Sequence, residues 1–277
     1  MKLFFKACAI LVFSLVINSC QKQISKPDAP DETHQLDSDA KNFLNKVQIE
    51  DTSITHAIDN LVKQLKVADL WNKFNALYPM VGGTANTTKW NLKDPRDIDT
   101  AFRLSFHGTP VFAPTGVLFP TTNDYADTHL YDTLLNNQDN AISYFSRTEN
   151  TVDGYDMGCS DNVFPYNKMA IFNTIGATDY FGFFNFQYMP VTTVGLFMLS
   201  ATAQNVKSYE NGIPKFEKGG SPGTEYSEYP ILIGYVLEAD SGGKRECSFA
   251  TIGKGLTDSE ALTFSNIVHE FNNRLSR

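Results

Sequence analysis

Apolar residues first recur at helical spacing between Ser53 and Pro79. Ile54 and Ile58 begin a stripe that continues through leucines and then through aromatic residues. Ser53 suits an N-cap, and Pro79 cannot continue a helix. The pattern therefore predicts one helix over Ser53–Tyr78, and we assign its aromatic stripe to core contacts.

The pattern changes from Val81 to about Gly253. Short apolar or alternating runs are separated there by clusters of Gly, Pro, Asn and Asp, which is typical of an all-β sandwich or barrel. Asn211-Gly212 predicts a tight hairpin turn, because both residues tolerate a positive φ. The candidate strands are Ala101–Phe106, Ile142–Arg147, Lys168–Phe172, Tyr180–Phe184, Val194–Ser200, Asn205–Tyr209, Ile231–Tyr235 and Cys247–Ile252.

The C-terminal stretch returns to helical spacing. Thr257 and Glu260 form a capping-box pattern, and Asp258 favours the positive end of a helix. Arg274 and Arg277 suit a last turn. The face that we expect to be buried consists of Phe264, Val268, Phe271 and Leu275.

The N-terminus has the pattern of an export signal. Lys2 and Lys6 precede a short apolar run, and small residues lead to Cys20. Val16–Cys20 resembles a bacterial lipobox, which implies a signal peptide over residues 1–19 and acyl chains on Cys20 as a membrane anchor. The alternative is a plain signal peptide with an incidental cysteine.

The residues after Cys20 are polar and rich in Asp. We expect residues 20–42 to be a flexible tether, because such a stretch buries too little apolar surface to offset its ordering entropy. The folded part then comprises an N-terminal helical segment over residues 43–80 and a sandwich with a C-terminal helix over residues 81–277. These features place the protein in the cell envelope, lipid-anchored, with the outer membrane as the expected location.

Composition narrows the classes of function. The 277 residues are 42% hydrophobic and 13% aromatic, enough for a sizeable core. The net charge of −8, with no cluster of Lys and Arg, argues against a nucleic-acid partner. No apolar run approaches the length of a membrane-spanning helix.

Three segments resemble the closing half of laminin-G-like domains, which are concanavalin A-like jelly rolls. They are Tyr209–Gly212, a strand end with an Asn-Gly turn; Ile231–Gly234, an "IG" strand; and Ile252–Glu260, a Gly-rich turn that leads into a helix start. The resemblance implies a mainly β fold: a concanavalin A-like jelly-roll β-sandwich with one N-terminal and one C-terminal α-helix. That fold hosts lectins, glycosidases, adhesion modules and structural parts, so it does not decide the function.

Other segments resemble a group of Bacteroidetes and phage-associated proteins of uncharacterised function. These segments are Tyr78–Ala85, Asn91–Asp97 and Tyr144–Thr148. With the laminin-G-like segments, the resemblance covers about residues 50 to 277. This resemblance implies no activity, but a phage-tail-like origin would suit a structural or assembly role.

Three sequence motifs of hydrolases are present only in part, and each lacks a residue or a spacing that its chemistry needs. Gly219–Gly223 matches G-x-S-x-G, but Pro222 has no N–H to donate to an oxyanion. His269-Glu270 is followed by Asn273 where a zincin needs its second histidine. Glu225 and Glu228 have the wrong spacing for one strand face, so paired glycosidase carboxylates are not indicated.

Two clusters could bind a ligand. Asp94, Asp97 and Asp99 could supply oxygens to calcium, although Arg96 lies among them. Sugar sites on β-sandwiches combine aromatic rings with Asp and Asn side chains. The best such constellation comprises Asn123, Asp124, Tyr125 and Asp127, and a second one comprises Tyr226 and Tyr229 beside Glu225 and Glu228.

Four cysteines reduce to two in an exported, acylated chain. Cys159 and Cys247 could form a disulfide in an oxidising compartment, and two separate buried thiols are the alternative.

Three functions remain open. The first is non-catalytic binding of a glycan or an adhesion partner by a membrane-anchored lipoprotein, with no nucleic acid and with calcium as the one cofactor considered. The second is a structural or assembly role that uses the sandwich for protein contacts. The third is a carbohydrate-active hydrolase, for which no convincing catalytic constellation is present.

Overall fold

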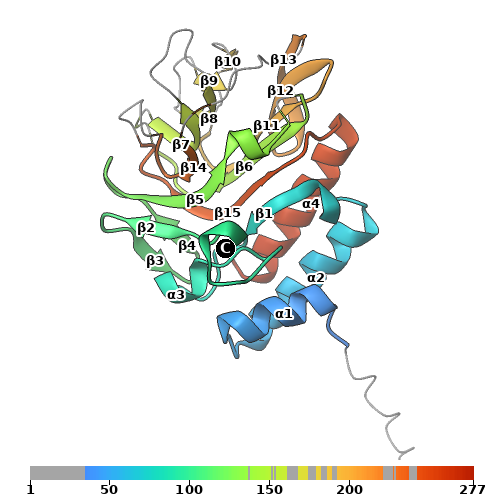
Figure 1. The fold of residues 1–277 in the computed structure, drawn as a ribbon, viewed down its shortest axis with the longest axis vertical. Coiled ribbons are helices and arrows are strands. Elements are labelled where there is room, and N and C mark those ends of the chain that lie inside the picture. Colours follow the sequence, from blue (N-terminus) through green and yellow to red (C-terminus); the bar gives the residue numbers. More distant parts are fainter. Residues whose placement is uncertain are drawn as a thin grey trace, which may run out of the picture. The chain divides into compact units, whose positions relative to one another are not determined.

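A computed structural model describes residues 35–136, 138–150, 152, 154–160, 168–173, 179–181, 186–188, 192–220, 227, 229–236 and 242–277. Within the compact unit Leu36–Arg277, two antiparallel β-sheets pack face to face, and helices cover the outer face of one of them (Figure 1). This is the mainly β, jelly-roll-like sandwich that the sequence predicts.

The first sheet, sheet A, has eight strands in the order β13-β12-β11-β6-β15-β4-β3, with β1 paired to β15. Its strands are β1 (Phe74–Tyr78), β3 (Val111–Ala113), β4 (Gly116–Leu118), β6 (Asn140–Ser146), β11 (Gly195–Ala201), β12 (Asn205–Glu210), β13 (Ile213–Gly219) and β15 (Glu246–Gly253).

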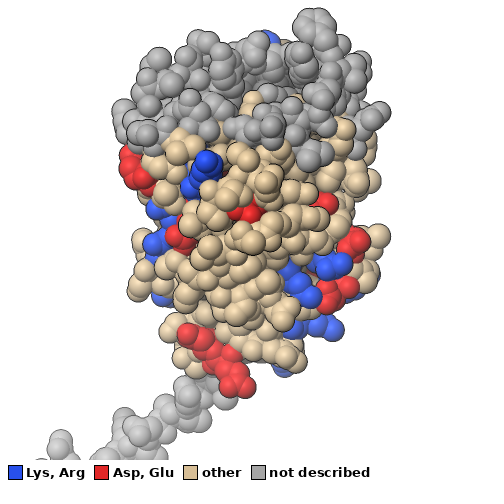
Figure 2. Space-filling view, turned by 90° about the vertical axis from the view of Figure 1, so that its left-hand side faces the viewer, with Lys and Arg blue, Asp and Glu red and all other residues tan. Residues whose placement is uncertain are grey.

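The second sheet, sheet B, has seven strands in the order β10-β9-β8-β7-β14-β5-β2. Its strands are β2 (Ser105–His107), β5 (Tyr125–Tyr131), β7 (Gly154–Ser160), β8 (Lys168–Asn173), β9 (Asp179–Phe181), β10 (Phe186–Tyr188) and β14 (Pro230–Ile233). On the side of β2 and β3, most of the described residues are uncharged, and the charged ones stand mainly toward the margins of the described part (Figure 2).

Two apolar cores hold these layers together. One lies between the sheets and includes Phe119, Tyr144 and Phe197. The other lies between sheet A and the helices, and includes Phe249 and Phe264. Because successive residues of a strand point to opposite faces, the strands of sheet A contribute to both cores.

The N-terminal helical segment differs from its prediction. It comprises α1 (Ser38–Val47) and α2 (Thr52–Val67). Asp51, not Ser53, caps α2, and its carboxylate accepts the Ser53 N–H at 2.7 Å. The structured part also begins earlier than the predicted tether end at residue 42, because an apolar stripe follows the Asp37 cap of α1. That stripe consists of Ala40, Phe43, Leu44 and Val47.

The last part of the predicted helix is a strand. A 3₁₀ turn over Trp71–Lys73 leads into β1, which pairs with β15. Phe74 and Leu77 face the helices, whereas Ala76 and Tyr78 face the core between the sheets. This division fits a strand buried on both faces.

The hairpin and the C-terminal helix are confirmed. Asn211 and Gly212 join β12 to β13 with φ values of 51° and 76°. The helix α4 (Asp258–Arg274) begins with a complete capping box between Thr257 and Glu260. A short helix, α3 (Ala85–Thr88), and the 3₁₀ turns Asp99–Ala101 and Asp132–Leu134 complete the described elements.

Arg277 lies beyond the last turn of α4 and ties it to the sandwich. Its guanidinium donates to the backbone carbonyls of Pro79, Met80 and Ser248, and lies 5.1 Å from the centre of the Phe271 ring. Burial lowers the pKa of Arg277 to about 9.

The two cysteines are separate, buried thiols. Cys159 lies in β7 of sheet B and Cys247 in β15 of sheet A, and both face the core between the sheets. The disulfide alternative is therefore wrong for this structure, and the second alternative, two free thiols, holds.

No helix among the residues that the structure describes is long and apolar enough to cross a lipid bilayer. The proposed signal peptide and Cys20 lie outside those residues.

Candidate functional site

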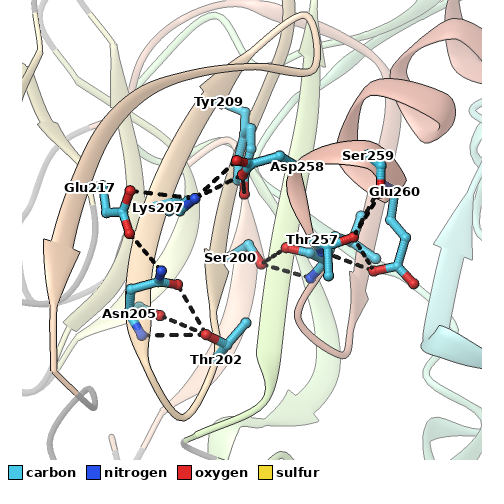
Figure 3. Close-up of polar contacts among 11 residues, drawn as sticks. Ser200, Thr202, Asn205, Lys207, Tyr209, Glu217, Thr257, Asp258, Ser259 and Glu260 are labelled. Atoms are coloured by element: carbon cyan, nitrogen blue, oxygen red, sulfur yellow. Dashed lines mark hydrogen bonds and ion pairs between the residues drawn. The ribbon is translucent and has the colours of Figure 1, made fainter.

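A polar cleft of about 510 Å³ lies between β12 and the start of α4 (Figure 3). Every second residue of β12 faces it, beginning with Asn205 and continuing with Lys207 and Tyr209. Such residues share one face of a strand. The remaining lining comes from the β11–β12 turn and from the loop that enters α4: Thr202, Gln204, Leu256, Thr257, Asp258 and Ser259.

Lys207 is the charged centre of the cleft. Its ammonium lies 2.9 Å from Asp258 Oδ1 and 3.4 Å from Glu217 Oε2. The Tyr209 hydroxyl donates to the same Asp258 oxygen at 2.9 Å. The hydrogen bond with Asp258 raises the pKa of Lys207, and the hydrogen bonds from Lys207 and Tyr209 lower the pKa of Asp258. Both groups are therefore held charged at neutral pH.

Asn205 extends this polar network along β12. Its amide nitrogen donates to Glu217 Oε1 at 2.6 Å, and the Thr202 hydroxyl donates to its amide oxygen at 3.0 Å. Figure 3 shows Asn205, Lys207 and Glu217 joined in one chain of contacts. Amide, ammonium, carboxylate and hydroxyl groups thus line one cleft.

The opposite wall of the cleft is fixed by Ser200 of β11. Its hydroxyl accepts the Leu256 N–H at 2.7 Å and donates to the Leu256 carbonyl at 3.1 Å. Beyond Leu256, the Glu260 carboxylate accepts the Thr257 N–H and binds Lys73 at 2.7 Å. The loop before α4 is therefore held at both ends.

The start of α4 does not suit an anion. The Thr257 hydroxyl accepts the Glu260 N–H, and two carboxylates, from Asp258 and Glu260, occupy the first turn. These negative charges already match the positive helix end. The cleft is therefore suited to a neutral ligand rather than to a phosphate or a sulfate.

Asp124 of the predicted ligand loop is a structural residue. Its side chain is 1% exposed. It accepts the N–H and the hydroxyl of both Thr109 and Thr121, with the two N–H contacts at 2.5 and 2.8 Å. Burial raises the pKa of Asp124, but these hydrogen bonds outweigh burial and bring the pKa below its ordinary value. Asp124 thus has no free acceptor face for a sugar, whereas Asn123 is exposed.

Tyr125 of β5 lies in a row of three rings, between one ring from β2 and one from the segment just after β14. Its ring centre is 4.5 Å from that of His107 and 5.7 Å from that of Tyr235, with interplanar angles of 13° and 22°. Because β2 and β14 flank β5 on opposite sides, the two neighbouring rings cover both faces of Tyr125. The row therefore does not offer the Tyr125 ring face that sugar stacking needs.

The predicted calcium cluster consists of ion-paired carboxylates. Asp94 pairs with Arg96. Asp97 lies 2.7 Å from Lys89, and Asp99 lies 2.8 Å from the Arg103 guanidinium. Among the described residues, no group of three or more His, Cys, Asp or Glu side chains has metal-binding geometry. These three carboxylates thus have cationic side chains, rather than a shared metal, as partners.

Residues from the two predicted clusters meet at one histidine. Asp99 from the first cluster and Asp127 from the second both lie within 4 Å of the His129 ring nitrogens. In the second predicted sugar constellation, Glu225, Tyr226 and Glu228 lie outside the described residues, and Tyr229 follows them at the start of β14.

No protein-family model and no curated protein matches this chain. Among solved structures, domain 4 of an extracellular GH43 arabinanase from Geobacillus stearothermophilus, solved with arabinotriose, is similar at 15% identity and a TM-score of 0.45. That match covers 70% of this chain and 98% of the domain. A Trypanosoma rangeli sialidase mutant that displays trans-sialidase activity is similar at 10% identity and a TM-score of 0.47. The match covers 77% of this chain but 39% of the sialidase.

A third similar structure is the CBM40 of a Ruminococcus gnavus sialidase, bound to α2,3-sialyllactose. Its identity is 11% and its TM-score 0.35, and the match covers 56% of this chain and 96% of that one. At these values the likenesses carry no argument about this chain, and its fold rests on the two packed sheets described above.

Sequence reasoning missed the cleft residues as a site. It identified Asn205–Tyr209 as a strand and Thr257–Glu260 as a helix start. The signal that could have found them is the alternation of Asn205, Lys207 and Tyr209, which places polar groups on one face of that strand.

Proposed function

We propose that the cleft between β12 and α4 binds a neutral, polyhydroxylated ligand, a sugar unit of a glycan, without chemically changing it. The observation that carries this proposal is the set of hydrogen-bonding groups on Asn205, Lys207 and Asp258 at one cleft. A sugar hydroxyl both donates and accepts hydrogen bonds, so its site must offer both kinds of partner. These three side chains do so from the two sides of one cleft.

Size and charge support the same ligand class. About 510 Å³ is in the range of small-molecule sites, and suits one or two sugar rings. The Lys207 charge is already matched by Asp258 and Glu217, so an ionic ligand would have to displace an existing ion pair. A neutral ligand can instead form hydrogen bonds with the Lys207 ammonium and with the carboxylates of Asp258 and Glu217 while their ion pairs stay in place.

Binding without cleavage is supported by the protonation state of Asp258. A glycosidase needs a carboxylic acid that keeps its proton near neutral pH, which requires a raised pKa. Lys207 and Tyr209 do the opposite to Asp258, since their hydrogen bonds lower its pKa. The cleft therefore favours recognition over hydrolysis.

The proposal is tested by a glycan-array screen of the purified full chain, with and without calcium. We expect saturable binding to one class of glycan. Lys207→Gln should weaken that binding about tenfold or more, because a lost hydrogen bond to a charged group is equivalent to about 1.5–3 kcal/mol. Asn205→Ala should weaken it about two- to tenfold, because a lost hydrogen bond between neutral groups is equivalent to about 0.5–1.5 kcal/mol.

The matched control is Asn273→Ala, an exposed asparagine near the end of α4, which should leave binding unchanged. A blank array with a protein that melts cooperatively would overturn the proposal and favour the assembly role. Binding that both cleft variants retain in full would place the glycan elsewhere.

We also propose that Cys20 carries the lipid anchor that presents this cleft at the cell envelope, at the outer membrane. The support is the lipobox-like Val16–Cys20 and the polar stretch that follows. Labelled palmitate should be incorporated by the wild type and not by Cys20→Ala, and equal labelling of the two would overturn the anchor.

A further inference from the structure

Ser105, His129 and Asp127 are neighbouring side chains on the outer face of sheet B. The Ser105 hydroxyl lies 2.7 Å from His129 Nε2. On the other side of the imidazole, Asp127 Oδ2 lies 3.8 Å from His129 Nδ1. The register brings them together, because Ser105 of β2 pairs directly with Asp127 of β5. The three side chains are partly exposed, so a reactant can approach them.

The backbone is distorted at the histidine. His129 has φ 55°, in the left-handed region that non-glycine residues rarely adopt. The β14–β5 register shifts at the same place, between Pro230 and Leu232, so β5 carries a bulge here. Bulges change the direction of side chains and are frequent beside active sites, as are strained residues.

Asp127 holds that distortion in place. Its Oδ1 accepts the backbone N–H of His129 at 2.7 Å, while its Oδ2 faces the Nδ1 of the same residue. One carboxylate thus fixes both the backbone and the ring. A carboxylate at Nδ1 favours the tautomer that carries its proton there, which leaves Nε2 free to accept a proton from Ser105. The second carboxylate near the ring, Asp99, lies 3.5 Å from Nε2, but Arg103 binds the same oxygen at 2.8 Å and matches its charge. Such contacts are often long in free enzymes and tighten with substrate.

We propose that Ser105, His129 and Asp127 are a nucleophile, base and positioning carboxylate that hydrolyse short acyl esters. Ser105 Oγ attacks the ester carbonyl and forms the acyl–oxygen bond, while His129 Nε2 takes the hydroxyl proton. The C–O bond to the alcohol then breaks, and the alcohol leaves with that proton. Water next attacks the acyl-serine and gives a proton to Nε2, and the carboxylic acid departs as Ser105 regains its proton.

The surroundings set the class of substrate. The Arg103 guanidinium is paired with Asp99 at 2.8 Å and with Asp97 at 3.6 Å, so the charges beside Ser105 and His129 match one another. The stacked rings of His107 and Tyr125 occupy the next cross-strand pair along β2 and β5. An open surface whose charges are already paired favours a neutral ester with a small acyl group.

The first test needs no variant. The full chain is incubated with a fluorophosphonate, which phosphonylates activated serines, and the site is mapped by mass spectrometry. We expect stoichiometric labelling at Ser105, and lost labelling when the protein is first unfolded in urea. A folded protein that leaves Ser105 unlabelled would overturn the proposal.

The second test measures hydrolysis of p-nitrophenyl acetate. Ser105→Ala and His129→Gln should each lower the rate at least tenfold, and Asp127→Asn should lower kcat with KM unchanged, because an amide can still accept the His129 N–H but no longer favours the reactive tautomer. His56→Ala, an exposed histidine on α2, controls for hydrolysis by a histidine elsewhere on the surface and should not change the rate.

Full activity in folded Ser105→Ala would overturn the serine mechanism, since imidazole alone would then account for the hydrolysis. The result is independent of the glycan proposal. Lys207→Gln should lose glycan binding and keep ester hydrolysis, so the failure of one proposal leaves the other intact.

Discussion

At the scale of single residues, Asp124 shows how a polar side chain in a loop can belong to the fold. Its buried carboxylate joins two segments by accepting the N–H groups of Thr109 and Thr121. Asp124→Ala leaves these donors without their partner. We expect it to lower the free energy of unfolding by about 2–3 kcal/mol, measured by urea denaturation at neutral pH.

The same variant has a predicted pH dependence. Because the pKa of Asp124 is lowered in the folded protein, its stabilisation is fully present above the unfolded value of about 3.9 and is lost as pH falls through the folded pKa. The stability difference between wild type and Asp124→Ala should therefore shrink in acid. Asn123→Ala is the matched control with no expected change, and a difference that stays constant down to pH 2 would contradict the assignment.

The sequence could not separate the two roles of such an aspartate. A carboxylate between turn residues looks the same whether it awaits a ligand or accepts backbone N–H groups. The decisive partner, Thr109, lies 15 residues away and comes close only when β2 and β5 pair. Gly108 allows this approach with φ 74°, because a Cβ there would lie 2.2 Å from Asp124 Oδ1.

At the scale of elements, the sequence predicted a structure correctly where all the residues that determine it are close together in the chain. The α4 capping box and the Asn211-Gly212 turn were correctly predicted because each depends on neighbours within a few residues. The prediction was wrong for the end of the first helix. The apolar residues of Phe74–Tyr78 fit the spacing of a helix as well as that of a strand, and pairing with β15 makes the segment a strand. The strand β5 was missed because Asp, Thr and His interrupt its alternation, although Ala126, Thr128 and Leu130 are buried in turn.

At the scale of the whole molecule, both proposed sites depend on contacts between distant segments. Lys207 and Asp258 are 51 residues apart, and Ser105 and His129 are 24 residues apart. A pattern within one element contains no information about such pairs. The order of strands in sheet B brings Ser105 to His129, because β2 lies beside β5. The packing of α4 against sheet A brings Asp258 to Lys207.

The packing of the two sheets can itself be tested through the cysteines. Cys159 and Cys247 lie one in each sheet and face the same core, so both become accessible only when the sheets separate. Burial raises the pKa of both thiols, which lowers the fraction of reactive thiolate further. Under non-reducing conditions, neither should react with iodoacetamide in the folded protein, and both should react in urea.

Peptide mapping by mass spectrometry distinguishes these two thiols from Cys8 and Cys20. The modification of Cys159 and Cys247 should rise together across the urea transition, because one core protects both. Separate transitions would show that the sheets open independently. A Cys159–Cys247 disulfide peptide would contradict the free thiols.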